Sequence, residues 1–150
     1  MSKERPIDVV VAGHICFDVI PKFPKTGEKD IGKILIPGKL VNVGKAATST
    51  GGPVSNTGLA LFKLGAKVRL NGKIGDDMFG EAIINRLKKY VDVSGMTIVR
   101  GEVSSYTIAL APPGIDRIFL HNPGANDTFG YSDVNFNLVK KAKIFHLGYP

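Results

Sequence analysis

Glycines and short polar residues gather in one stretch, residues 50–65, where their spacing could bind a ligand. Gly51 and Gly52 come directly before Pro53, which suits the first turn of a helix because its φ is fixed and its missing N–H is not needed there. Two glycines at a helix start leave backbone N–H groups bare, so an anionic or hydroxyl-bearing ligand can approach closely. Asn56, in the first turn, could cap the helix or face such a ligand.

A second group of candidate residues follows the first predicted strand. His14, Cys16 and Asp18 share one face if this segment is extended. All three residue types bind metals, but a tight site wants a fourth ligand and a closed geometry, and the sequence shows neither. We therefore predict no metal site. Asp18, at the carboxyl end of the strand, is either a polar group facing a ligand crevice or a solvated turn residue.

Motifs of several common nucleotide-binding and hydrolytic sites are absent. The chain has no G-x-G-x-x-G, so the dinucleotide fingerprint is missing, and no Gly-Lys-Ser/Thr follows the glycines of residues 51–58 as a Walker A loop requires. Ser55 does not lie in a G-x-S-x-G elbow. No H-E-x-x-H or paired C-x-x-C occurs. These absences argue against dinucleotide enzymes, P-loop proteins, serine hydrolases and zinc sites.

Composition is that of an ordinary globular protein, with 43% hydrophobic and 22% charged residues. Lys and Arg number 20 against 13 Asp and Glu, giving a net charge of +7. The charge is scattered, without an arginine cluster or an aromatic-interleaved basic stripe, so we expect no nucleic-acid partner. No apolar run approaches the roughly 20 residues of a membrane span. A single cysteine fits a reducing compartment, and we expect a cytoplasmic protein.

Alternating strands and helices are predicted to position the candidate residues. Apolar patterning indicates strands at 7–13, 67–75, 96–99 and 143–148, and helices at 54–64, 81–90 and from 132–135 to about 140. Gly65 would end the first long helix, and Asp76 or Asp77 would cap the second. This order is typical of an α/β sheet.

Two antiparallel excursions interrupt that alternation. Residues 34–36 and 40–43 flank a Pro-Gly turn, which predicts a hairpin or another strand-turn-strand excursion. Residues 106–111 and 117–121 bracket a five-residue turn and predict a second one. We expect the two hairpins to pair into a small accessory sheet. Residues 23–33 are predicted to be loop, and 46–52 a mobile approach to the first long helix.

The glycine-rich segments have the order and spacing of a family signature. Gly-Gly-x-x-x-Asn at residues 51–56 is followed, at matching distance, by Gly-x-Ile-Gly-x-Asp-x-x-Gly at residues 72–80. Residues 13–18, the hairpin at 106–121 and Gly124-Ala125-Asn126 add to the match. In this order they resemble the ribokinase-like (PfkB) carbohydrate kinases, over nearly the whole chain.

The resemblance implies a three-layer α/β fold of ribokinase type, here partial, with a mostly parallel sheet and a small antiparallel β lid. Residues 1–150 would form the amino-terminal part of the kinase domain, with lid segments at about 31–45 and 103–121. By the same resemblance Asp18, Gly51, Gly52 and Asn56 hold the hydroxyls of a sugar or nucleoside. A carboxylate and a carboxamide suit that task because they accept and donate several hydrogen bonds.

The second signature of the family, Asp-Thr-x-Gly-Ala-Gly-Asp, does not occur in this sequence. In the family it carries the catalytic base and a helix-start anion hole. The resemblance implies ATP and Mg²⁺, and we expect their main site to lie beyond residue 150. We therefore expect no catalytic and no cofactor-binding residue within the chain, which we interpret as the amino-terminal half of a kinase.

The expected function is ATP-dependent phosphorylation of a sugar, polyol or nucleoside hydroxyl by the complete kinase. The alternative is a non-catalytic sugar-binding or regulatory module. We expect a homodimer through the lid, or pairing with another chain at an exposed sheet edge. Lys73 could meet a substrate phosphate but is expected to be solvated, and Asp77 is expected to be a helix cap rather than a ligand group.

Overall fold

A three-stranded parallel sheet forms the centre of the body. The computed structural model describes residues 6–149. The strands β4 (Val68–Asn71), β1 (Ile7–Ala12) and β9 (Ala142–Leu147) lie in the order β4-β1-β9. Val9 pairs with Val68 on one side and with Ile144 on the other. The β-branched run of β1 is buried on both faces, as a central parallel strand requires.

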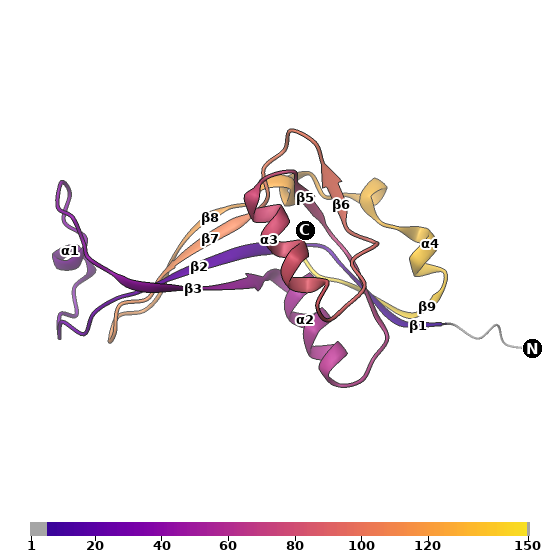
Figure 1. Ribbon diagram of the computed structural model, residues 1–150, viewed down its shortest axis with the longest axis horizontal. Helices are drawn as coiled ribbons and strands as arrows, with labels where there is room; N and C mark the ends of the chain where they lie inside the picture. The colour runs from indigo at the N-terminus through magenta and orange to yellow at the C-terminus, as the bar shows by residue number, and fades with distance from the viewer. Residues whose placement is uncertain (1–5, 150) are drawn as a thin grey trace, which may run out of the picture.

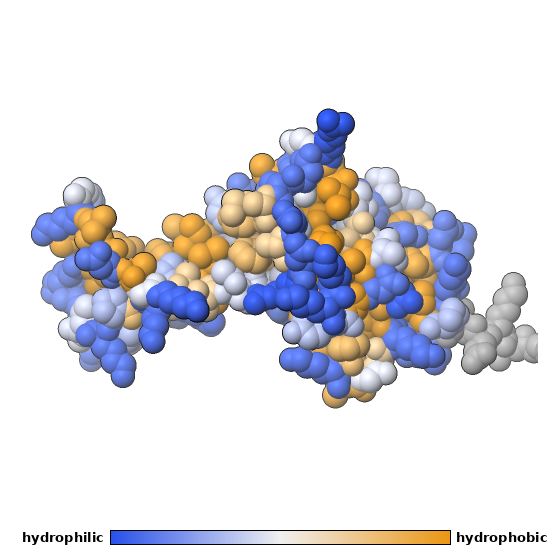
Figure 2. Space-filling model, viewed as in Figure 1, coloured by the Kyte–Doolittle hydropathy of each residue, from blue (hydrophilic) through white to orange (hydrophobic). Residues whose placement is uncertain are grey.

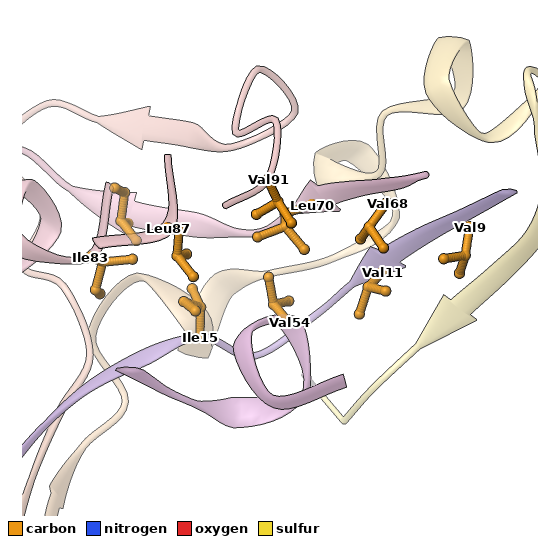
Figure 3. Packing of buried hydrophobic residues seen from close by; sticks show 10 residues of the cluster. Val9, Val11, Ile15, Val54, Val68, Leu70, Ile83, Leu87 and Val91 are labelled. Carbon is orange, nitrogen blue, oxygen red and sulfur yellow. The ribbon is translucent and has the colours of Figure 1, made fainter. Parts of the chain in front are cut away.

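Helices pack on both faces of this sheet and give the body three layers. On one face α2 (Gly52–Lys63) and α3 (Met78–Leu87) cover a cluster that includes Val11, Val54 and Leu70, each fully buried (Figure 3). On the other face the short α4 (Phe136–Val139) packs against Val10 and its neighbours. The alternation of Val10 and Val11 between the two clusters follows from the period of two in a strand.

A second sheet leaves the body as a long arm (Figure 1). It contains β3 (Gly44–Gly51), β2 (Cys16–Lys22), β7 (Tyr106–Leu110) and β8 (Ile118–Asn122), in the order β3-β2-β7-β8. We call it the arm sheet. Its β2–β3 and β7–β8 pairs are antiparallel, whereas β2 and β7 are parallel. The short α1 (Ile31–Ile34) lies at the far end of the arm.

The remaining elements connect body and arm. The strands β5 (Lys73–Gly75) and β6 (Thr97–Val99) form a separate parallel pair. Two 3-10 helices, η1 (Gly124–Thr128) and η2 (Tyr131–Asp133), lead from β8 to α4. No helix within residues 6–149 is both long and apolar enough to cross a membrane.

Most predicted elements are confirmed. The predicted strands at 7–13, 96–99 and 143–148 correspond to β1, β6 and β9, and the hairpin at 106–121 is β7–β8. Helix α2 has Pro53 in its first turn and ends at Lys63; Gly65 follows two residues later with a φ of +89°, the left-handed conformation expected after a helix. Asp77 caps α3 and accepts a hydrogen bond of 2.9 Å from the Gly80 N–H.

The predicted hairpin at residues 34–43 is wrong. Ile34 ends α1, and the next strand in the chain is β3, in a stretch we predicted to be a mobile approach. Asp30 caps α1 by accepting a hydrogen bond from the Gly32 N–H, which helps to explain why a helical turn replaces the first strand. The small residues of β3 have weak strand propensity, but pairing with β2 satisfies their backbone groups, so tertiary context overrides propensity.

The single strand predicted at residues 67–75 is also divided in two. Its first part, β4, belongs to the central sheet, and its second part, β5, turns away after Gly72 to pair with β6. A Cβ at Gly72 would lie 3.1 Å from the terminal methyl of Met96, so the backbone passes close to a side chain there.

We predicted that the segments at about 31–45 and 103–121 form a lid that closes over a ligand, and this role stays a prediction.

Candidate active-site cleft

A large cleft lies where the arm meets the body. It has a volume of about 600 Å³. Three of its residues, Asp18, Thr107 and His121, stand side by side on β2, β7 and β8 in the strand register. The residues that line it come from the arm sheet, the start of α2 and the segment after β9: His14, Cys16, Asp18, Ile20, Gly52, Thr107, Ala109, Ala111, Arg117, Phe119, His121 and Tyr149.

The Asp18 carboxylate is held in place through both of its oxygens. Ser49 Oγ donates to Asp18 Oδ2 at 3.1 Å, and Cys16 Sγ donates to Asp18 Oδ1 at 3.3 Å. Burial and the neighbouring Asp18 charge raise the pKa of the Cys16 thiol to about 12, so this thiol stays protonated and can donate. The half-buried carboxylate therefore faces the cleft in a fixed orientation, and its remaining lone pairs can accept hydrogen bonds from a ligand.

Gly51 brings the start of α2 against this carboxylate. A Cβ at Gly51 would lie 2.6 Å from Asp18 Oδ2 and 2.9 Å from Cys16 Sγ. Its φ of −122° is ordinary extended backbone, so only the close approach demands glycine. At Gly52 both the backbone conformation and the close approach require glycine, because its φ is +78° and a Cβ would lie 2.5 Å from the His14 carbonyl oxygen.

Asn56 stands apart from the other predicted site residues. It is the fifth residue of α2, is exposed and does not line the cleft. No side chain caps α2, so Asn56 is not the helix cap that the sequence left open. Its neighbour Ser55 is buried, with Oγ 2.6 Å from Thr50 Oγ1. The structure thus brings together Asp18 and the two glycines, whereas the role of Asn56 stays a prediction.

Two histidines and a tyrosine in the cleft were not predicted to work together. The His14 ring lies 5.3 Å from the His121 ring and 5.4 Å from the Tyr149 ring, measured between centroids. His121 Nδ1 is 2.9 Å from Thr107 Oγ1. Burial, and then the nearby His121, lower the pKa of His14. The alternation within the hairpin could have placed Thr107 and His121 on one face, but nothing in the sequence links that face to His14.

Lys73 is not the solvated lysine that we predicted. It is buried, and its Nζ donates to Thr128 Oγ1 at 2.7 Å and to the Thr128 carbonyl oxygen at 3.2 Å. Its Nζ also lies 3.6 Å from Asp133 Oδ1. Lys73 thus ties β5 to the segment after β8 and does not line the cleft.

Residues 6–149 contain no group of three or more His, Cys, Asp or Glu side chains that could hold a metal ion. At the start of α2, the Val54 N–H already donates to the His14 carbonyl oxygen at 3.1 Å. What the cleft can offer a ligand is an oriented carboxylate, two imidazoles, the guanidinium of Arg117 and an apolar wall.

Known proteins resemble this chain in sequence. Residues 7–149 match the protein family described as "pfkB family carbohydrate kinase". The probable fructokinase-5 of Arabidopsis thaliana is 37% identical over 101 residues, which cover 65% of this chain and 31% of that protein. Fructokinase-2 of Oryza sativa subsp. japonica is 28% identical over 147 residues, which cover 96% of this chain and 40% of that protein.

Solved structures of the same kind share the fold. The fructokinase of Halothermothrix orenii matches with a TM-score of 0.69 at 24% identity, over 94% of this chain and 46% of that one. The Arabidopsis thaliana ribokinase complexed with ribose and ATP matches with a TM-score of 0.74 at 19% identity, over 94% of this chain and 45% of that one. The chain thus spans less than half the length of these relatives. Because the family match covers nearly all of it, the chain belongs to the PfkB family of carbohydrate kinases.

Proposed function

We propose that this chain is the acceptor-binding part of a kinase that transfers a phosphoryl group from ATP to a hydroxyl of a sugar or a related polyol or nucleoside. One observation carries the proposal: the Asp18 carboxylate, oriented by Ser49 and Cys16, points its free lone pairs into a cleft beside Gly51 and Gly52. A carboxylate so placed can accept hydrogen bonds from two sugar hydroxyls. The apolar wall of the cleft suits the carbon skeleton of a sugar.

The chemistry of transfer needs groups that this chain does not supply. Phosphoryl transfer requires a positioned hydroxyl, a base and electrostatic stabilisation of the moving group. The described residues serve the first requirement: they bind the acceptor, orient its hydroxyl and exclude water from the apolar side. We propose that the base, the ATP pocket and Mg²⁺ belong to the portion of the family domain that the longer relatives have in addition. The reducing cytoplasm is the proposed compartment.

The exposed edge of the central sheet supports this proposal. β9 is an edge strand, and Ile144, Leu147 and Tyr149 are 63, 56 and 67% exposed. An open apolar edge strand favours pairing with further strands or another chain. Figure 2 shows hydrophobic side chains at the surface of both the body and the arm. We propose that further sequence of the same protein covers β9, and that the arm sheets of two protomers pair in a homodimer.

Substitution of Asp18 tests the proposed role of the cleft. In the whole protein that contains this chain, Asp18→Asn should lower kcat/KM for the phosphorylated sugar about 100-fold, because two charge-assisted hydrogen bonds weaken. Asp127→Asn is the matched control, since Asp127 is exposed and lies outside the cleft. Equal activity of the Asp18→Asn variant and the wild type would refute the proposal.

A non-catalytic sugar-binding module is the second candidate function, because an oriented carboxylate and two imidazoles already line one cleft within residues 14–149. Calorimetry with fructose and ribose on the 150-residue chain separates the two. A module binds sugar with useful affinity by itself, whereas an acceptor half of a kinase binds weakly. Phosphorylation of sugar by the 150-residue chain with ATP alone would contradict both the module and our assignment of the base to further sequence.

A further inference from the structure

The outer half of the cleft contains a cation that hydroxyl binding does not require. Arg117 comes directly before β8 and lines the cleft together with Phe119. The guanidinium carbon of Arg117 lies 5.7 Å from the centroid of the Phe119 ring. A cation over an aromatic face is attracted by the ring, so this contact directs the long side chain along the strand towards the inner cleft.

The strand register sets the separation between Arg117 and Asp18. Asp18 and Thr107 stand level with His121, and Phe119 is the next residue of β8 on the same face, paired with Ala109. Two residues along a strand span about 7 Å. The guanidinium, folded over Phe119, is therefore about 7 Å along the arm from the row of Asp18 and two strand spacings, about 10 Å, across the sheet from it, because β7 lies between β2 and β8. A six-carbon sugar with a terminal anionic group has a suitable length to reach both.

The space between the two charged groups is open because small residues line its floor. Thr107 and Ala109 of β7, and Ala111 directly after it, are every second residue of this segment and line the cleft. Their methyl groups leave room beneath the level of Phe119 and Ile20. A bulky residue at either alanine would separate the inner, hydroxyl-binding end of the cleft from the outer, cationic end. As it is, the cleft runs continuously from Asp18 to Arg117.

The Arg117 guanidinium has no acidic partner among residues 6–149. None of the ion pairs in this part of the chain includes it. The adjacent carboxylate, that of Asp116, instead accepts a hydrogen bond of 2.8 Å from the Arg117 backbone N–H. Asp18 is the one carboxylate that lines the described cleft, and it belongs to the other end. The cationic fork thus remains available to an anion, which it can bind through two parallel hydrogen bonds.

We propose that the preferred acceptor is a sugar that bears a phosphate or carboxylate group, with its hydroxyls at Asp18 and its anionic group at Arg117. The inference rests on the proposed sugar-kinase function and sharpens it, because it favours an anionic sugar over a neutral one. His14 and His121 stand beside the inner end and supply ring nitrogens for further hydroxyls.

Paired substrates that differ in charge test this inference. With the whole protein and ATP, kcat/KM is measured for fructose, fructose 6-phosphate and gluconate. The wild type should prefer one of the anionic sugars to fructose. Arg117→Gln should reduce that preference at least about tenfold, chiefly through KM, and Arg117→Lys should restore part of it. Added salt should raise KM for the anionic sugar.

Arg100→Gln is the matched control, because Arg100 is exposed and does not line the cleft. It removes the same charge and should leave the preference unchanged. A preference for fructose in the wild type, or an equal ratio in the wild type and Arg117→Gln, would overturn the inference while leaving the kinase proposal intact. If no sugar is phosphorylated, the kinase proposal fails, and calorimetric binding of fructose 6-phosphate that is unaffected by Arg117→Gln would overturn the inference separately. The arm with the higher kcat/KM, fructose 6-phosphate or gluconate, identifies the anionic group as phosphate or carboxylate.

Discussion

Adding one methyl group at Gly51 should weaken sugar binding while sparing the fold. In Gly51→Ala the new Cβ would lie 2.6 Å from Asp18 Oδ2, whereas ordinary van der Waals contact begins at 3.4 Å. The carboxylate must therefore move by about 0.8 Å. That shift is enough to strain or break its hydrogen bonds from Ser49 Oγ and Cys16 Sγ, which are 3.1 and 3.3 Å long. The displaced carboxylate then no longer faces the sugar hydroxyls in its bound geometry.

The size of the effect follows from the bonds that are lost. A hydrogen bond to a charged group contributes about 1.5–3 kcal/mol. Losing one such bond to the sugar corresponds to a roughly 10- to 150-fold higher Kd or KM. The free energy of unfolding should change little, because the φ of −122° at Gly51 suits alanine and a less flexible unfolded chain offsets part of the strain.

The assay compares Gly51→Ala with Gly65→Ala in the whole protein. Nothing lies within 4 Å of a Cβ at Gly65, but its φ of +89° is unfavourable for alanine. Gly65→Ala should therefore lower the free energy of unfolding by about 1 kcal/mol and leave KM unchanged. KM for the sugar is measured in a coupled ADP assay, and unfolding is followed in urea. A folded Gly51→Ala variant whose KM lies within twofold of the wild type would refute this account of Asp18.

Three further outcomes are expected. Asn126→Ala removes the hydrogen bonds of a buried side chain to the N–H and the carbonyl oxygen of Ile15, so urea unfolding should show a loss of about 2–5 kcal/mol, and a loss below about 1 would contradict this. The raised pKa of Cys16, about 12, should make native alkylation by iodoacetamide at least about 100-fold slower than in urea, as mass spectrometry can show; equal rates would be inconsistent with the buried thiol. Because the pKa of His14 is lowered in the folded state, the unfolded chain takes up a proton at a higher pH than the folded chain does. The free energy of unfolding should therefore be full above the ordinary pKa of 6.5 and should decline as the pH falls below that value. His14→Gln should flatten this decline in urea titrations, and an unchanged pH profile would contradict the expectation.

Much of the fold could be predicted because its signals are local. The valines of β1 mark a strand buried on both faces, Pro53 and Gly65 mark the two ends of α2, and Asp77 marks the start of α3. Each signal depends on a few neighbouring residues and on backbone preferences that hold in most proteins. The prediction failed at β3, where Gly, Ala, Ser and Thr form a strand only because β2 offers a partner.

The candidate site was predicted in part. Asp18, Gly51 and Gly52 were named from the sequence, and the structure brings them together: Gly51 leaves no room for a Cβ beside the Asp18 carboxylate, and Gly52 lines the same cleft as Asp18. Lys73 was misjudged, because its partners Thr128 and Asp133 lie far along the chain and no local pattern indicates them. A buried cation can be recognised only when the groups that compensate its charge are known.

By itself the sequence determined the family, the order of strands and helices, and the residue types that can hold a hydroxyl-bearing ligand. These properties follow from spacing, capping and periodicity along the chain. The tertiary structure alone decided that β2, β7 and β8 place Asp18, Thr107 and His121 in one row, and that Arg117 stands at the other end of the same cleft. Strand register joins residues that are distant in sequence, and it is set by the pairing of β2 with β7 and of β7 with β8 rather than by a preference of any one segment.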